Sequence, residues 1–89
     1  MELIYEKDNQ RAALYDAGKL IGECDYELED DHWVITHTFV EKAYGGQGLA
    51  RKLVNTLIEE ARKEQIRIKP VCSYAVKVLS DQIYDDVRL

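Results

Sequence analysis

The residues AYGGQGLARKL, positions 43–53, join a predicted strand to a predicted helix. Three glycines, at positions 45, 46 and 48, loosen the backbone directly after an apolar stretch. Leucines then recur every four residues, at positions 49, 53 and 57, which is the spacing of one face of an amphipathic helix. We therefore expect a helix from residue 49 to about residue 65, entered through a glycine turn.

The segments on either side of this helix are typical of parallel strands. HWVITHTFV, residues 32–40, precedes it, and IRIKPVC, residues 66–72, follows it. Strand, helix and strand in this order predict a right-handed parallel crossover. Pro70 has no N–H to donate, so pairing is expected to fail at or near it. Two interpretations remain open: residues 66–72 form an edge strand, or they part from residues 32–40 and open a slot between the two strands.

The first half of the chain predicts antiparallel strands over residues 3–6, 11–16 and 20–28, separated by turn residues. In the third strand, one predicted face carries Leu20, Gly22, Cys24, Tyr26 and Leu28, and the other carries Ile21, Glu23, Asp25 and Glu27. Both faces of the strand at 32–40 are largely apolar, so we expect it to be central and covered on both sides. One of those faces would carry Trp33, Ile35, His37 and Phe39.

These elements predict the α+β class. A mixed sheet of about four antiparallel strands is extended by a β-α-β crossover, and a second short helix follows over residues 73–79. The 89 residues are expected to form a single domain, 1–89. The last ten residues, SDQIYDDVRL, have no clear pattern.

Composition excludes several functional classes. The net charge of −5 and the pI near 4.9 argue against nucleic acid as the main partner. No apolar run reaches membrane-spanning length, and the N-terminus does not resemble a signal peptide. Two cysteines and two histidines in scattered positions predict neither a disulfide framework nor a metal site. The simplest location is a reducing cytoplasm.

The start of the predicted helix has the wrong charges for its own dipole. No Ser, Thr, Asp or Asn occupies the expected cap position near Gly46 or Gln47, and Arg51 and Lys52 lie in the first turn. A phosphate group bound by the free N–H groups would satisfy such a helix. The alternative is an ordinary tight turn followed by surface cations. The turn is neither a Walker loop nor a GxGxxG motif.

The segment HTFVEKAYGGQGLARKLVNTLIEEARK resembles the acetyl-coenzyme A-binding segment of the GNAT superfamily of N-acetyltransferases. Gly48 and Ala50 match the last two defined positions of the superfamily motif, whereas Gly45 stands where Gln or Arg is usual. The chain is also similar to a short, single-domain branch of the superfamily over roughly residues 20–88. That branch has an I-x-H-T-x-V-like run (Ile35, His37, Thr38, Val40), a Cys-Ser/Pro-aromatic run (Cys72, Ser73, Tyr74) and a late Tyr-x-Asp-Val (Tyr84, Asp86, Val87).

The resemblance implies acetyl-coenzyme A (acetyl-CoA) as co-substrate. Backbone amides of the glycine turn would hold its pyrophosphate, and the exposed backbone of Thr38–Val40 would pair with pantetheine like a strand. The implied cofactor-binding residues are Thr38, Phe39, Val40, Gly45, Gly46, Gln47, Gly48, Leu49, Ala50 and Arg51. No metal is implied.

Three residues are candidates for catalysis, each with a structural alternative. Cys72 precedes a short predicted helix and could accept the acetyl group or act as an acid near the thioester, or it could be a small buried apolar residue. His37 is the best general-base candidate by its ordinary pKa, and the alternative is a hydrogen-bonded core histidine. Tyr84, like Tyr74, could protonate the leaving thiolate, although with six tyrosines chance placement competes. Glu41 is another possible base.

We therefore expect N-acetyl transfer from acetyl-CoA to an unidentified amine or protein acceptor. The acidic row Glu23, Asp25 and Glu27 either attracts that amine or forms a solvated strand face. Because the chain is too short to wall an acceptor site fully, the expected states are a monomer or a weak homodimer. A non-catalytic acyl-CoA-binding or sensing module is the main alternative. A protein-interaction domain without a ligand is a further one.

Overall fold

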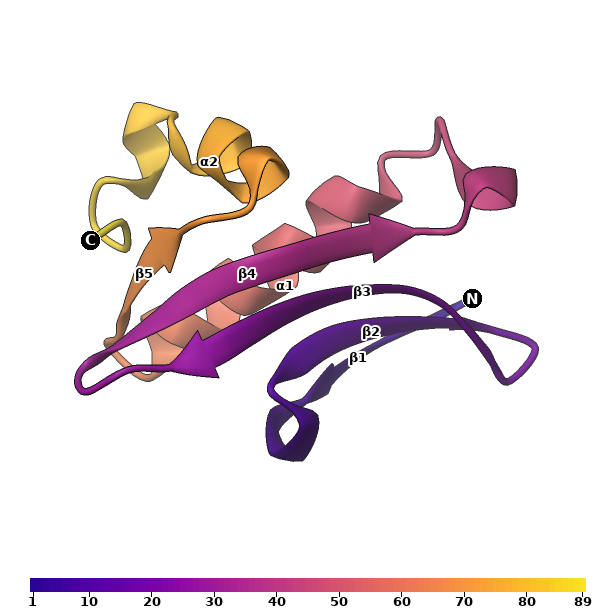
Figure 1. The fold of residues 1–89 in the computed structure, drawn as a ribbon, viewed down its shortest axis with the longest axis horizontal. Helices are drawn as coiled ribbons and strands as arrows, with labels where there is room; N and C mark the ends of the chain where they lie inside the picture. Colours follow the sequence, from indigo (N-terminus) through magenta and orange to yellow (C-terminus); the bar gives the residue numbers. More distant parts are fainter.

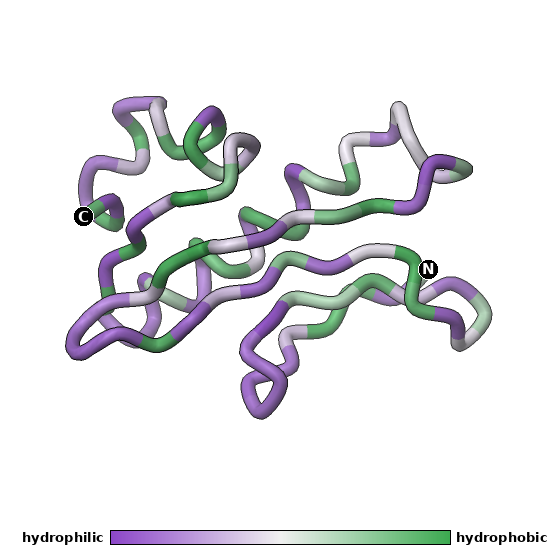
Figure 2. Tube along the Cα trace, viewed as in Figure 1, coloured by the Kyte–Doolittle hydropathy of each residue, from purple (hydrophilic) through white to green (hydrophobic).

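Five strands form one sheet and follow each other across it in the order of the sequence (Figure 1). The computed structural model describes all residues, 1–89. Strands β1 to β4 are antiparallel neighbours and β5 is parallel to β4, which confirms the predicted α+β class and crossover. The strands are β1 (Glu2–Glu6), β2 (Arg11–Asp16), β3 (Lys19–Leu28), β4 (His32–Val40) and β5 (Arg67–Pro70). Hydrophilic residues dominate the turns near 7–10 and 29–32 (Figure 2).

Helix α1 (Leu49–Lys63) contacts all five strands and lies behind the sheet in Figure 1. It ends two residues before the predicted position, because Gln65 adopts a left-handed conformation that a helix cannot continue through. Helix α2 (Ser73–Leu79) follows β5 and packs against α1, β4 and β5. The buried side chains of α1 are those that the four-residue spacing predicts: Leu49, Leu53, Val54, Leu57, Ile58 and Ala61.

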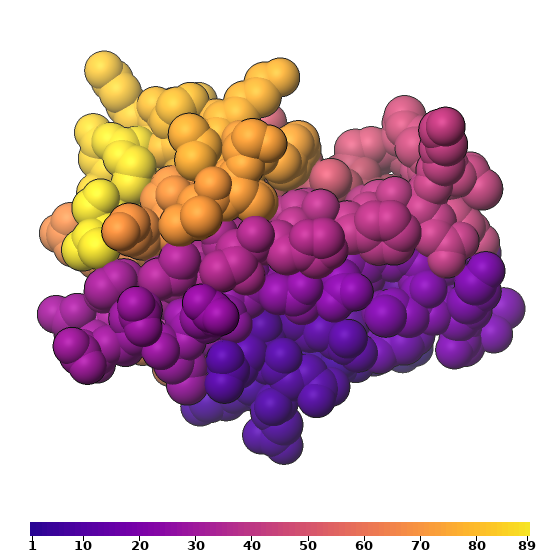
Figure 3. Space-filling view, in the orientation of Figure 1, coloured from indigo at the N-terminus to yellow at the C-terminus, as the bar shows by residue number.

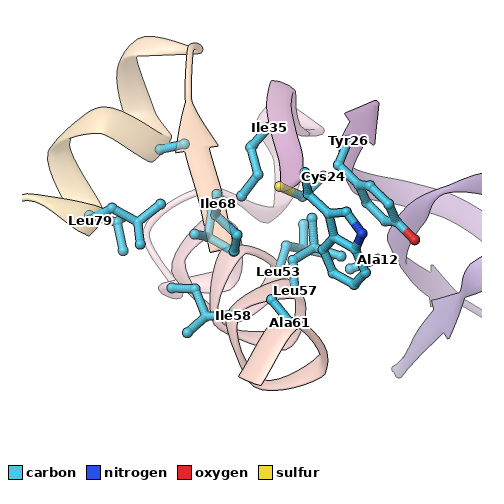
Figure 4. Packing of buried hydrophobic residues seen from close by; sticks show 14 of the residues in the cluster. Ala12, Cys24, Tyr26, Ile35, Leu53, Leu57, Ile58, Ala61, Ile68 and Leu79 are labelled. Atoms are coloured by element: carbon cyan, nitrogen blue, oxygen red, sulfur yellow. The ribbon is translucent and has the colours of Figure 1, made fainter. Parts of the chain in front are cut away.

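A single apolar cluster joins the two helices to one face of the sheet (Figure 4). Trp33 is 2% exposed and stacks on Tyr26 with ring centroids 4.2 Å apart. The hydroxyl of Tyr26 meets that of Tyr5 at 2.7 Å, so the polar ends of this aromatic group are satisfied. Ile68 on β5 and Leu79 on α2 complete the cluster beside β4.

A bulge in β3 places Ile21 on a different face of the strand from the one predicted. Ile21 is predicted to face solvent with the acidic residues, but it is fully buried in the core. The pairing with β2 shifts by one residue between Leu14 and Tyr15, so Ile21 is an extra residue on the β3 side. One inserted residue moves the next side chain to the other face, which sequence alternation alone does not reveal.

The second face of the sheet carries no helix, contrary to the prediction that β4 is covered on both sides. Every buried residue of α1 and α2 belongs to the cluster that contains Trp33. On the opposite face, His37 is exposed and 46% of Phe39 is exposed. We call this second face of the sheet the open face.

The C-terminal residues, which have no clear pattern in the sequence, extend the sheet beyond β5. The N–H of Ile68 donates to the carbonyl of Val87 at 2.6 Å, and the N–H of Leu89 donates to the carbonyl of Ile68 at 2.8 Å. Val87 is 1% exposed and joins the core. These bonds cover the outer edge of β5.

Candidate active site

Strands β4 and β5 pair at one end and part at the other. Their register runs from His32 opposite Arg67 to Ile35 opposite Pro70 and stops there. The Ile35 carbonyl accepts the N–H groups of both Val71 (3.0 Å) and Cys72 (3.2 Å), after which the chain turns into α2. The predicted effect of Pro70 is thus confirmed, and residues 36–40 of β4 have no strand beside them on that side. Figure 3 shows a notch there, between α2 and residues 42–48.

A bulge at Thr36 changes which side chains face the notch. Asp25 pairs with His37, but the next residue of β3, Tyr26, pairs with Ile35, so Thr36 is an extra residue on β4. Before the bulge, odd-numbered residues of β4 face the helices; after it, even-numbered residues do. As a result Thr38 faces the helices, as Ile35 does, while His37 points to the open face. The prediction that His37 shares a face with Trp33 and Ile35 is wrong for this reason.

The unpaired part of β4 offers backbone groups to a ligand. The N–H of Glu41 donates to the carbonyl of Ile21 at 2.8 Å, so Glu41 points toward β3. Because successive residues of a strand direct their backbone groups to opposite sides, Thr38 and Val40 direct theirs away from β3. Their N–H and C=O groups therefore line the notch as a short free edge, which an extended ligand could pair with.

The glycine turn leads from this edge into α1. Gly46 and Gly48 have φ angles of +79° and +72°, which few other residues adopt readily. Gly48 is the N-cap, one or two residues later than the sequence indicates, and no side chain caps the helix. The first turn contains no acidic residue, and Arg51 and Lys52 are exposed beside it. The first N–H groups of α1 are thus open to an anion.

Tyr44, a residue that the sequence did not single out, anchors this turn. Its hydroxyl donates to Asp16 at 2.6 Å, and this bond to a carboxylate raises the pKa of Tyr44. Gln47 donates from its amide to the carbonyl of Tyr44 at 3.3 Å. The turn is therefore held against the β2–β3 hairpin, so its position depends on residues distant in sequence.

Cys72 lies where β5 leaves β4, as the N-cap of α2. Its sulfur accepts the N–H of Ala75 at 3.4 Å and contacts the hydroxyl of Thr38 at 3.3 Å. Cys72 is partly buried, so its side chain borders the notch on the side of the helices. Cys24 is fully buried, and burial raises the pKa of its thiol to about 12.

His37 is on the other side of β4 from Cys72, so the structure does not bring these two candidates together on one face. The His37 ring is nearly parallel to that of Phe39, with centroids 6.4 Å apart and an interplanar angle of 8°. It lies opposite Asp25, whose carboxyl is partly buried beside Glu23. Burial first, and then Glu23, raise the pKa of Asp25 to about 6.

Comparison with known proteins decides the family. Residues 10–87 match the sequence model of the GCN5-related N-acetyltransferase family. The chain belongs to this family. No match is found among curated proteins.

Solved structures of N-acetyltransferases share the fold. A GCN5-like candidate N-acetyltransferase from Staphylococcus aureus is 28% identical, with a TM-score of 0.77 over 99% of this chain and 87% of that one. The ribosomal-protein-S18-alanine N-acetyltransferase of Escherichia coli is 21% identical (TM-score 0.66) over 79% of this chain and 48% of that one. The N-acetylglutamate synthase of Neisseria gonorrhoeae, solved with coenzyme A and N-acetyl-glutamate, is 18% identical (TM-score 0.66). The match covers 83% of this chain and 19% of that one.

In this member of the family, Tyr84 packs within the C-terminal part of the structure. It is 6% exposed, and its hydroxyl donates to Asn55 of α1 at 3.2 Å. The guanidinium group of Arg62 lies 5.6 Å from the centre of its ring. These contacts favour a packing role for Tyr84 over the protonation of a leaving thiolate.

Two cavities of the chain lie outside the notch. One of about 380 Å³ is lined by Arg62, Gln65, Ile66, Arg67, Asp86 and Val87. Another, of about 240 Å³, is lined by Met1, Leu3, Leu14, Leu49 and Lys52. No group of three or more His, Cys, Asp or Glu side chains is placed to hold a metal ion. Neither helix combines the length and apolar character that crossing a bilayer requires.

Proposed function

We propose that this chain binds acetyl-CoA in the notch between β4 and α2 and transfers the acetyl group to an amine. The observation that carries the proposal is the meeting of two binding features at the carboxyl end of β4. The free backbone edge of Thr38 and Val40 is followed, after residues 41–48, by an uncapped helix. An extended pantetheine chain suits the edge, and a pyrophosphate suits the helix start.

The residues of the turn would bind the pyrophosphate through backbone amides and through positive charge. Amides from Gly45 to Ala50 would bind the pyrophosphate, and glycine allows the close approach that such contacts need. Arg51 lies exposed in the first turn and adds positive charge. The relative from Neisseria gonorrhoeae contains coenzyme A in its structure, which supports this ligand class for the shared fold.

The transfer itself needs a free amine close to the thioester. The amine nitrogen would attack the carbonyl carbon, coenzyme A would leave as a thiolate, and the amine would lose a proton. Cys72 borders the notch on the helix side and His37 stands on the open face, so the two residues could serve different steps. His37 is the candidate for the base, and holding both reactants together supplies much of the rate enhancement.

A titration with coenzyme A, followed by amide shifts, tests the binding step. We expect shifts concentrated in residues 38–40 and 45–51. A Gly48→Glu variant would place a carboxylate where the phosphate binds and should weaken binding at least tenfold. No affinity at millimolar ligand, or unchanged affinity in this variant, would remove the assignment of the phosphate site.

Gly18→Glu is the matched control, because Gly18 also has a positive φ (+81°) and, like Gly48, open space around its missing side chain. Both substitutions add one negative charge and similar backbone strain, and only Gly48 lies at α1. The control should bind coenzyme A as the wild type does. Formation of free coenzyme A from acetyl-CoA in the presence of an amine then distinguishes transfer from binding alone.

A further inference from the structure

Two cysteine side chains from different parts of the chain meet one threonine hydroxyl. The Thr38 hydroxyl lies 3.4 Å from the sulfur of Cys24 on β3 and 3.3 Å from the sulfur of Cys72 at the start of α2. Thr38 faces this way only because the bulge at Thr36 reverses the alternation of β4. The three side chains therefore form a continuous chain of contacts from the core to the notch.

The Thr38 hydroxyl lies between the two sulfurs, so it can accept a hydrogen bond from one and donate to the other. The Cys24 thiol is fully buried, and burial raises its pKa to about 12, so it retains its proton at neutral pH. The hydroxyl of Thr38 is the hydrogen-bond partner of this thiol. With Cys24 as donor, the hydroxyl oxygen of Thr38 is the acceptor, and its own proton is free to be donated onward.

The onward acceptor is the sulfur of Cys72. This sulfur also accepts the N–H of Ala75 at 3.4 Å. In this arrangement the sulfur has one donor from a side chain and one from the backbone. Because these two partners come from different segments of the chain, they fix the direction in which the Cys72 sulfur points.

We propose that Thr38 is a positioning residue for Cys72: the Thr38 hydroxyl holds the Cys72 sulfur beside the free edge of β4. Its part in acetyl transfer rests on the function proposed above. Thr38 contributes its backbone to the edge assigned to pantetheine and its side chain to Cys72. One residue thus sets where the sulfur stands relative to the thioester.

The test is the rate at which Cys72 is alkylated by iodoacetamide, without coenzyme A, measured by mass spectrometry of the separate cysteine peptides. Thr38→Val and Thr38→Ala both remove the hydroxyl, with different side-chain volumes, and each should slow the reaction at pH 7 about tenfold. Thr38→Ser keeps the hydroxyl and should restore the rate to within about twofold.

Thr56→Val is the matched control, because the hydroxyl of Thr56 donates to the carbonyl of Lys52 on α1, away from both cysteines. It should leave the rate unchanged. Cys24 reports on folding in every variant, since it reacts only if the core opens. Unchanged rates in both hydroxyl-free variants, or a serine variant as slow as the valine variant, would overturn the proposal.

The outcome is independent of the proposed function. If coenzyme A does not bind but the hydroxyl-free variants still slow alkylation, the positioning role holds and the acetyl-transfer assignment falls. If coenzyme A binds and alkylation does not depend on the hydroxyl, only the role of Thr38 falls.

Discussion

Four side chains from four neighbouring strands lie in one row across the open face. The register places Glu6 opposite Arg11, Arg11 opposite Asp25, and Asp25 opposite His37. Arg11 donates to Glu6 at 2.7 Å and to Glu23, outside the row, at 3.5 Å, so the charges of Glu6 and Arg11 are paired. Asp25 has Glu23 as a like-charged neighbour, and it is the member whose ionisation is disfavoured.

The raised pKa of Asp25, about 6, predicts a pH-dependent effect of Asp25→Asn. An acid whose pKa is raised on folding contributes stability below its unfolded pKa and loses that contribution as the pH rises through its folded pKa. The amide side chain of the variant does not ionise, so the melting temperature of the variant relative to the wild type should rise between pH 4 and pH 7. Glu23, Arg11 and His37 face the same group and remain unchanged in both proteins.

Thermal melts of both proteins at pH 4, 5, 6 and 7 measure this difference. Hydrogen bonds from Tyr15, Asn9 and Arg11 lower the pKa of Glu6, so its contribution to stability rises with pH, opposite to that of Asp25. Glu6 is present in both proteins, so comparing them at each pH removes its contribution. A difference that stays constant or falls with rising pH would contradict the prediction.

At the scale of elements, β3 approaches its neighbours closely at Gly22. A side chain there would meet the carbonyl oxygen of Phe39 at 3.0 Å and the side chains of Leu53 and Val40 at 3.3 Å each. The glycine thus allows β3 to lie against both β4 and α1. The close packing of β3 against β4 and α1 at Gly22 also places α1, and with it the glycine turn, near the end of β4.

Gly22→Ala should destabilise the protein by about 1–3 kcal/mol, because the added methyl group meets a backbone atom that cannot simply rotate away. Urea unfolding measures the loss. Gly45→Ala is the control: Gly45 has an ordinary φ of −65°, and its new methyl group would meet only the carbonyl of Lys42 at 3.3 Å. If both variants unfold at the same urea concentration, the close approach at Gly22 is not a constraint on packing.

At the scale of the whole molecule, one apolar cluster supports every part of the site. It joins α1 and α2 to the same face of the sheet, so the notch between β4 and α2 exists only while this cluster is packed. A domain of this size has a small margin of stability, of the order of 5–15 kcal/mol. A single large cavity in the core is therefore a serious loss.

Leu53→Ala should cost about 2–5 kcal/mol, because Leu53 is fully buried between α1 and the sheet. The midpoint of urea unfolding should fall, and binding of coenzyme A should be lost over the same range of urea. Leu28→Ala removes the same atoms from a side chain that is 57% exposed and should change the midpoint little. Equal losses in the two variants would contradict the assignment of the core.

Local features of the sequence determined the elements and much of the part of the site that we assign to the cofactor. The four-residue spacing of leucines specifies α1, since that spacing places them on one helical face. Pro70 ends the pairing of β4 and β5, because it has no N–H to donate. The uncapped start of α1 could also be read directly, as no capping residue is present there.

Only the tertiary structure decided which side chains meet. The bulges at Ile21 and Thr36 reverse the alternation of β3 and β4, and neither residue type marks a bulge in the sequence. A bulge is set by how two strands align over their whole length, so one strand does not contain the information. The reversal moves His37 to the open face and brings Thr38 to Cys72. The chemistry of the site therefore depends on register, which only the assembled sheet fixes.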